Sequence, residues 1–304
     1  MVFMDSFSAS LSRQEGVVDS IFSTCLDMLE EPAFAHIQGI GIASGENIRL
    51  GGPAIDRLTN VFSITKAVVA MAARHALHQR LFASLDDTVT LDGHTCPPTI
   101  GNLLAMKQSW RLEPDMDEIE RRAVDPVPSI ANALGRSTST GQYVNAGMHL
   151  LMRELHLRTG SARSFVEDEV LLPAGICAYK WEGDATGVPW GHAHLHLSVR
   201  DTLRLGMHWL GAEPLVPRSG EPTPPMPPEC LPYVDGFWIG NSYLLAAGWG
   251  GQCLLMIPAT HTVFTALADT GWSRRTNRDT LQDGWRTGRE LFHRSLPEAV
   301  AWRS

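Results

Sequence analysis

Ser63 and Lys66 are the two residues whose types and spacing most directly suggest chemistry. They stand three positions apart, so in a helix both side chains project from one face, close enough for a hydrogen bond. A serine hydroxyl is a weak nucleophile until a neighbouring base takes its proton, and a lysine can be that base where burial lowers its pKa. The pair therefore predicts covalent catalysis with Ser63 as the nucleophile.

The residues after Lys66 favour burial of this pair. Positions 67–73 contain no polar residue, which predicts a helix that is apolar on nearly all sides and lies inside the protein. The alternative is that Ser63 caps the helix while Lys66 reaches back to solvent. A serine and a lysine at this spacing form a short motif, so on these residues alone the alternative stays open.

The composition narrows the class of protein. The chain has 304 residues, of which 44% are hydrophobic and 19% charged, as in a globular protein with a sizeable core. A formal charge of -8 without a basic run argues against nucleic acid as a partner. The five cysteines are odd in number and widely separated, so we expect buried thiols and neither a metal site nor a redox site.

The N-terminal residues 1–13 show neither a basic start nor an apolar stretch of signal-peptide length, and no run reaches the length of a membrane span. We therefore expect a cytoplasmic protein without a membrane partner. The oligomeric state is left open.

The order of expected elements predicts the architecture. Helical or strand periodicity marks helices at 12–30, 99–107, 146–159, 163–172, 199–210 and 277–294, and strands at 37–43, 47–50, 236–247, 252–257 and 262–268. We interpret residues 112–122 as a solvated acidic face, and the proline-rich residues 214–232 as a surface connection. This order predicts an α/β (α+β) fold. Residues 1–62 and 236–304 would form the sheet domain and 63–235 a mainly helical domain, with the active site between them.

Three motifs in this chain resemble those of one known superfamily. Ser63-Ile-Thr-Lys66 matches S-x-x-K, Tyr143-Val-Asn145 matches Y-x-N, and Trp249-Gly250-Gly251 stands where β-lactamases carry Lys-Thr-Gly. The chain thus resembles the serine β-lactamase and penicillin-binding-protein superfamily, in the class C-like branch with family VIII carboxylesterases and 6-aminohexanoate-oligomer hydrolases. The resemblance implies an antiparallel sheet flanked by helices, with an inserted mainly helical region.

The resemblance also implies residue roles. Ser63 would be acylated, and Lys66 would accept or relay its proton. Tyr143 would pass that proton to the leaving group, and Asn145 would bind substrate and orient Lys66. A phenol is a useful base only beside a cation that favours its phenolate, and Lys66 would be that cation. The oxyanion would lie between the backbone N–H groups of Ser63 and Gln252.

One departure from the family pattern bears on the substrate. Trp249 replaces a cation that helps to hold a substrate carboxylate, and an apolar wall suits an ester or amide without that carboxylate better. Gly250 and Gly251 would let substrate approach the strand closely. We therefore expect a carboxylesterase-like serine hydrolase acting on a small ester. The alternatives are an amide hydrolase or acyltransferase, then a β-lactamase or DD-peptidase, and last a non-catalytic binding module.

Three alternating histidines, His192, His194 and His196, need a separate interpretation. On one side of a strand they could bind zinc. No second cluster of ligand residues accompanies them in the sequence, and the hydrolase constellation needs no metal. We therefore expect no metal and no cofactor, and we expect His192 to line the substrate pocket.

Overall fold

The computed structural model describes residues 16–91, 93, 96–122, 124–139, 141–211, 222–226, 229–269 and 287–295. The chain divides into two units. Unit 1 comprises Met1–Thr59, Leu197–Pro214 and Asn241–Ser304, and unit 2 comprises Asn60–His196 and Leu215–Gly240. The predicted domain boundaries stay a prediction. They placed Leu197–Pro214 in the helical domain 63–235, whereas this segment belongs to unit 1, which contains the sheet strands β1 (Ile37–Ser44) and β12 (Thr262–Ala268).

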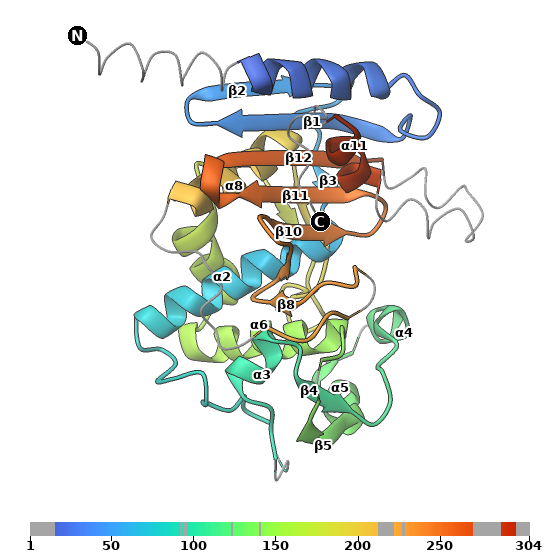
Figure 1. Cartoon of the computed structure of the whole chain (residues 1–304). Coiled ribbons are helices and arrows are strands. Elements are labelled where there is room, and N and C mark those ends of the chain that lie inside the picture. The colour runs from blue at the N-terminus through green and yellow to red at the C-terminus, as the bar shows by residue number, and fades with distance from the viewer. Residues whose placement is uncertain are drawn as a thin grey trace. The chain divides into compact units, whose positions relative to one another are not determined.

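Unit 1 is built on antiparallel strands in the order β2-β1-β12-β11-β10 (Figure 1). Ile37 of β1 lies opposite Ala268 of β12, so one strand from the N-terminal part of the chain and one from its C-terminal part pair in the same sheet. The strands are β1 (Ile37–Ser44), β2 (Asn47–Gly51), β10 (Leu244–Gly248), β11 (Gln252–Ile257) and β12 (Thr262–Ala268). The predicted strands 37–43, 47–50, 252–257 and 262–268 are thereby confirmed. The single strand predicted over 236–247 is wrong, because residues 240–243 separate β9 (Phe237–Ile239) from β10.

Helices cover both faces of this sheet. Gly206 of α8 (Val199–Gly211) packs against Val263, whereas Gly288 of α11 (Thr287–Ser295) packs against Ala266. Val263 and Ala266 are three positions apart on β12, so they point to opposite faces. Residues 16–28 form a further helix, and η3 (Pro258–Thr260) joins β11 to β12. The first residues of the predicted helices 12–30 and 277–294 lie outside the described residues, as does most of the proline-rich segment.

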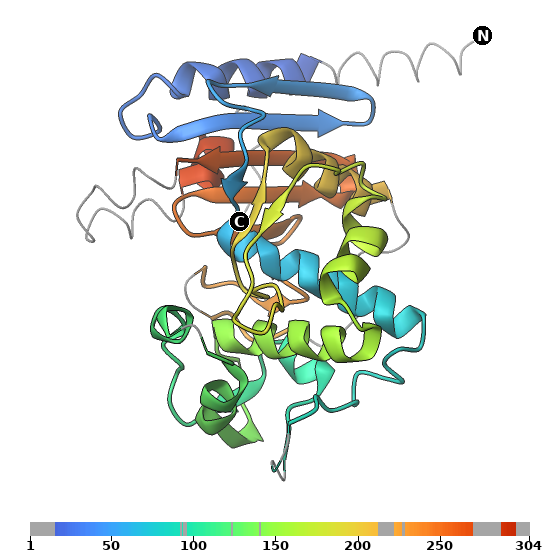
Figure 2. The ribbon, with the colours of Figure 1, turned by 180° about the vertical axis from the view of Figure 1, so that it is seen from behind.

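Unit 2 is mainly helical. Its longest helices, α2 (Thr65–His78) and α6 (Asn145–Thr159), pack against each other (Figure 2). The predicted helix 99–107 begins at its Thr99 cap but ends at Leu104. The other elements are η1 (Phe62–Ile64), α3 (Ile100–Leu104), α4 (Met116–Arg121), α5 (Val127–Ala133), α7 (Ala162–Val166), the π-helical turn η2 (Glu167–Leu171), and the strands β4 (Gln108–Trp110), β5 (Leu134–Thr138), β6 (Lys180–Trp181) and β8 (Tyr233–Val234); β3 (Thr59–Asn60) and β7 (Leu195–Leu197) lie at its boundary.

A turn between β8 and β9 lies directly on the first turn of α2. A Cβ at Gly236 would come within 2.4 Å of Ala67 Cα, and φ of Gly236 is +84°. Both the close contact and the left-handed backbone conformation therefore require glycine at this position. The neighbouring Asp235 is buried and forms an ion pair with Arg74 of α2. These contacts fix the start of α2 against the hairpin.

The structure also bears on the predictions about the cysteines and about membrane spans. Cys25 and Cys253 are buried free thiols, as expected, but Cys96, Cys177 and Cys230 are exposed, so the expectation of five buried thiols is wrong. In the described part of the chain, no helix combines the length and the apolar character needed to cross a membrane. The cytoplasmic location stays a prediction.

Candidate active site

Ser63 and Lys66 lie where η1 runs directly into α2. Phe62, just before Ser63, has the left-handed φ of +46°, and its N–H donates to Asn60 Oδ1 at 2.8 Å. Such a backbone conformation is costly for a side chain with a Cβ and is often retained at functional sites. The helix that follows is buried from residue 65 to residue 73, which confirms the predicted apolar helix.

Lys66 is fully buried and touches Ser63. Its exposed fraction is 0%, so the alternative in which Lys66 reaches solvent is wrong. Lys66 Nζ lies 2.6 Å from Ser63 Oγ, and it also donates to the backbone oxygen of His192 at 3.0 Å. Burial lowers the pKa of Lys66 well below its ordinary value, because an ammonium group is poorly solvated inside the protein. This shift favours the neutral amine, whose lone pair can accept the proton of the serine hydroxyl.

Tyr143 joins this pair. Its ring centroid lies 4.9 Å from Lys66 Nζ, and its ring stacks on Trp238 at 5.1 Å and meets Tyr233 edge-on at 5.5 Å. Burial raises the pKa of Tyr143 above its ordinary value; a hydrogen bond with Ser63 lowers this pKa, and the charge of Glu229 raises it. The sequence led us to expect a tyrosine phenolate beside a cationic lysine. The lowered pKa of Lys66 and the raised pKa of Tyr143 favour the neutral amine and the neutral phenol instead. A neutral phenol can instead pass a proton along a chain of hydrogen bonds.

Asn145 is the first residue of α6, two positions after Tyr143. The predicted helix 146–159 is confirmed, and it ends at Gly160, which is left-handed with φ +78°. The contacts predicted for Asn145, to substrate and to Lys66, stay a prediction.

The carbonyl that accepts from Lys66 belongs to the hairpin between β6 and β7. Asp184, in the turn of this hairpin, pairs with His149 Nε2 of α6 at 3.1 Å, and both side chains are buried. Gly191 passes so close to α6 that a Cβ there would stand 2.2 Å from Met148 O. The hairpin is therefore held on α6 immediately before His192.

The predicted arrangement of the histidines on one side of a strand is wrong. Only His196 lies in β7, and His194 has a left-handed φ of +67°. His192 is 5% exposed, and burial lowers its pKa to about 4, although a hydrogen bond to Glu120 opposes the shift. His192 is consequently a neutral imidazole near neutral pH. Its predicted role in lining a substrate pocket stays a prediction.

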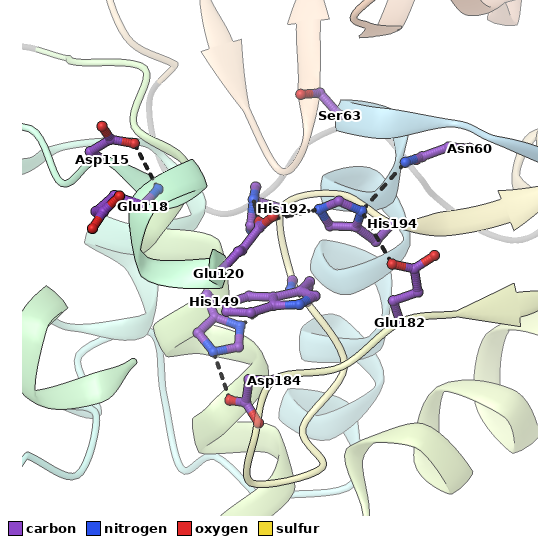
Figure 3. Close-up of polar contacts among 12 residues, drawn as sticks. Asn60, Ser63, Asp115, Glu118, Glu120, His149, Glu182, Asp184, His192 and His194 are labelled. Carbon is purple, nitrogen blue, oxygen red and sulfur yellow. Dashed lines mark hydrogen bonds and ion pairs between the residues drawn. The ribbon is translucent and has the colours of Figure 1, made fainter. Parts of the chain in front are cut away.

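Glu120 is the residue that the sequence interpretation missed. Nε2 of His192 and Nε2 of His194 lie 3.0 Å and 3.1 Å from its carboxylate (Figure 3). Burial raises the pKa of Glu120, but the hydrogen bonds from the two histidines outweigh burial and bring it to about 2. Glu120 is thus not part of a solvated acidic face. No local pattern marks it, because its partners lie more than 70 positions further along the chain.

The other predicted substrate-binding residues belong to unit 1. Trp249, Gly250 and Gly251 form the turn between β10 and β11, and Gln252 begins β11. The Gln252 side chain donates to Ala268 O at 3.1 Å and accepts from Ala268 N at 2.7 Å, which fastens the end of β12. The roles of these residues toward substrate, including the backbone N–H of Gln252, stay predictions.

Solved structures with a similar fold come from several hydrolases. EstCE1, described as a hydrolase with promiscuous acyltransferase activity, is 16% identical, with a TM-score of 0.64 over 91% of this chain and 100% of that one. A Bacillus anthracis protein described as a candidate 6-aminohexanoate-dimer hydrolase is 14% identical, with a TM-score of 0.65 over 90% and 83%. A D-stereospecific amidohydrolase from Streptomyces sp. is 14% identical, with a TM-score of 0.66 over 92% and 99%. These likenesses show the fold alone.

Sequence comparison identifies the family. A search of curated proteins finds no match, whereas the family model described as Beta-lactamase matches residues 38–283. The predicted α/β (α+β) class and the resemblance to the β-lactamase superfamily are thereby confirmed. Since the match spans most of the sequence, this chain belongs to the β-lactamase family.

Proposed function

We propose that this protein is a serine hydrolase that cleaves a small carboxylic ester through an acyl-enzyme on Ser63. One observation carries the proposal: Ser63 Oγ lies 2.6 Å from Nζ of the fully buried Lys66. Burial lowers the pKa of this lysine, so its amine is available as a base for the hydroxyl proton.

The reaction would run in two halves. As Ser63 Oγ attacks the ester carbonyl carbon, its proton moves to Lys66 Nζ, and a tetrahedral oxyanion forms. The bond from that carbon to the leaving oxygen then breaks, and the proton passes from Lys66, directly or through the Tyr143 phenol, to the departing alcohol. A water molecule attacks the acyl-enzyme with the same groups in reverse, which releases the acid and restores Ser63.

The preference for an ester rests on the residue types near the expected pocket. Trp249 supplies no charge where β-lactamases carry a lysine, so a substrate carboxylate would lack that partner. The match to a β-lactamase family model and the fold of EstCE1, a hydrolase, support hydrolytic activity.

Amide hydrolysis is the second candidate, and one observation favours it. Burial keeps Tyr143 in its phenol form, hydrogen-bonded with Ser63. A phenol in this place can deliver a proton to a leaving nitrogen, and amines leave far less readily than alcohols unless they are protonated. The fold is also that of a D-stereospecific amidohydrolase.

Intact-protein mass spectrometry with peptide mapping tests the proposal. The protein is incubated with a fluorophosphonate probe and with p-nitrophenyl esters of several chain lengths, while nitrophenol release is followed. We expect a label on Ser63 and continuous release, and we expect Ser63→Ala to lose both. Ser164→Ala, a change at an exposed serine, is the matched control. Labelling elsewhere, or undiminished turnover by Ser63→Ala, would remove the proposal.

A stoichiometric burst without turnover would instead point to an acyltransferase that lacks its acceptor. Matched ester and anilide substrates separate the two candidates, since amide hydrolysis predicts that the anilide is also cleaved at Ser63.

A further inference from the structure

The cluster formed by Glu120, His192 and His194 has no part in the reaction as described so far. Glu120 comes from α4, and the two histidines come from the segment of the β6–β7 hairpin just before β7 (Figure 3). Each histidine directs its Nε2 atom at the same carboxylate, at 3.0 Å from His192 and at 3.1 Å and 3.2 Å from His194. The carboxylate of Glu120 therefore bridges His192 and His194, which have one residue between them in the chain.

The hydrogen bonds define which ring nitrogens carry protons. A carboxylate only accepts, so Nε2 of each histidine is the donor. Asn60 Oδ1 is occupied by the N–H of Phe62 at 2.8 Å, which leaves the Asn60 amide nitrogen facing His194 Nδ1 at 3.5 Å. The carboxylate of Glu182 lies 4.0 Å from the same Nδ1 atom, so Nδ1 of His194 has both a donor and an acceptor near it. The bonds to Glu120 hold both rings with a proton on Nε2.

The same pattern argues against a metal ion on these three residues, although their ligand atoms lie within 4.8 Å of one another. A histidine that binds a metal through Nε2 normally donates its Nδ1–H to an acceptor. The buried His192 Nδ1 has no hydrogen-bond partner among the described residues, whereas His194 Nδ1 has the Asn60 amide nitrogen at 3.5 Å and Glu182 Oε2 at 4.0 Å. His192 therefore lacks the acceptor that a histidine bound to a metal through Nε2 normally has.

The cluster connects to Lys66 through the backbone. The carbonyl oxygen of His192 accepts from Lys66 Nζ at 3.0 Å, and the same Nζ lies 2.6 Å from Ser63 Oγ. Close by in the chain, His194 has a φ of +67°, which is costly for a residue with a Cβ and persists only where surrounding contacts impose it. The bonds to Glu120 on both sides of residue 193 are such contacts.

We propose that Glu120 is a positioning residue for Lys66: by holding His192 and His194, it fixes the His192 carbonyl that keeps Lys66 Nζ on Ser63 Oγ. The inference rests on the proposed role of Ser63 and Lys66. A neutral amine that donates one N–H to this carbonyl directs its lone pair away from it, toward the serine hydroxyl. Without the carbonyl in place, Nζ has several orientations and fewer of them are productive.

The expected effect is a slower acylation of Ser63 in folded protein. Losing one well-placed hydrogen bond in a buried network typically corresponds to a rate loss of about tenfold or more. Glu120→Asp keeps the charge but shortens the reach to the two imidazoles, so we expect it to lose about as much rate as Glu120→Ala. Glu120→Gln keeps the reach but offers one acceptor in place of two, so its loss should be smaller.

The test measures the rate of Ser63 labelling by a fluorophosphonate in these three variants, at saturating and subsaturating probe. Glu118→Gln is the matched control, because Glu118 lies on the same helix and pairs only with Arg121 and Arg122 among the described residues. Thermal unfolding separates folded variants from damaged ones. Imidazole 15N spectra, assigned with His192→Gln and His194→Gln, report the Nε2–H tautomers, which should be present in the wild type and lost in Glu120→Ala.

The outcomes are distinct. Wild-type rates in folded Glu120→Asp and Glu120→Ala would overturn the inference while leaving the proposed function intact. A slow Glu120→Gln beside a normal Glu120→Asp would also overturn it, because the charge alone would then be responsible. Saturable zinc binding that depends on all three residues would replace the hydrogen-bonded cluster with a metal site. No label on wild-type Ser63 would remove the proposed function itself, and this inference with it.

Discussion

The buried state of Lys66 predicts a specific dependence of stability on pH. Lys66 has an exposed fraction of 0%, and burial lowers its pKa well below the ordinary 10.5. In the unfolded chain the same amine has its ordinary pKa. Between the lowered pKa and 10.5, the unfolded chain therefore binds one more proton at this residue than the folded protein does. Folding must release that proton, so Lys66 costs stability that is regained as the pH rises.

The magnitude follows from proton linkage. One proton bound only by the unfolded state changes the free energy of unfolding by about 1.4 kcal/mol per pH unit. At pH values between the lowered pKa of Lys66 and 10.5, the stability of the wild-type protein should thus increase with pH at up to this rate. Lys66→Met fills similar space without a titratable group, so its stability should lack this increase and should exceed that of the wild type most at the lower pH.

The measurement is urea unfolding of wild type and Lys66→Met, followed by tryptophan fluorescence, at about pH 7, 8 and 9. The quantity of interest is the slope of the difference between the two proteins, because the lost contact with His192 adds a constant offset only. Lys180→Met, at an exposed lysine, is the control for the same chemical change. A difference between wild type and Lys66→Met that does not change with pH would show that Lys66 is charged when buried, and the base assigned to Ser63 would be refuted.

Four further substitutions, one of them a control, test separate parts of the structure. Tyr143→Phe removes the hydroxyl that contacts Ser63, so turnover of esters should fall by about a hundredfold or more; a mild effect would mean that the proton reaches the leaving group without it. Gly236→Ala should lower the free energy of unfolding by about 2 to 5 kcal/mol, since its Cβ would overlap Ala67 in addition to the left-handed φ. Gly160→Ala shares the positive φ but meets nothing within 4 Å, so urea unfolding should show a loss of only about 1 to 2 kcal/mol, and equal losses would contradict the overlap. Thr99→Ala removes the cap that accepts from Asn102 N at 3.1 Å and should cost about 1 kcal/mol in the same measurement, whereas no loss would mean that solvent replaces the cap.

Local patterns in the sequence were sufficient for much of the fold. Alternation and turn residues located β1, β2, β11 and β12 to within one residue, because each strand carries its own signal. The spacing of Ser63 and Lys66 on an apolar helix led to the contact that the structure contains. In each case the information is held within about ten consecutive residues.

The residues that surround the contact between Ser63 and Lys66 could not be predicted from local sequence patterns. Glu120, Trp238 and the His192 carbonyl come from three distant segments, and neither an acidic stretch nor a backbone oxygen carries a local signal. The protonation of Tyr143 was inferred from the presence of a lysine, but it depends on the burial of both groups, which only the folded chain defines. The break of the predicted strand is different, because it falls at Gly240-Asn241-Ser242, residue types that favour a turn and that the prediction of one continuous strand overlooked.

The pairing of β1 with β12 also has a consequence for the nascent protein. All eight residues of β1 are buried in the folded chain, yet their partners in β12 lie more than 200 positions later. At about 5 to 20 residues per second, a ribosome needs about 10 to 40 s to make the intervening chain. During that time β1 can pair with β2 but not with β12. The backbone N–H and C=O groups along the edge of β1 that later pairs with β12 therefore have no partner strand. Slower or colder synthesis lengthens this interval, so the yield of folded protein should depend on chaperones that shield the first hairpin until β12 emerges.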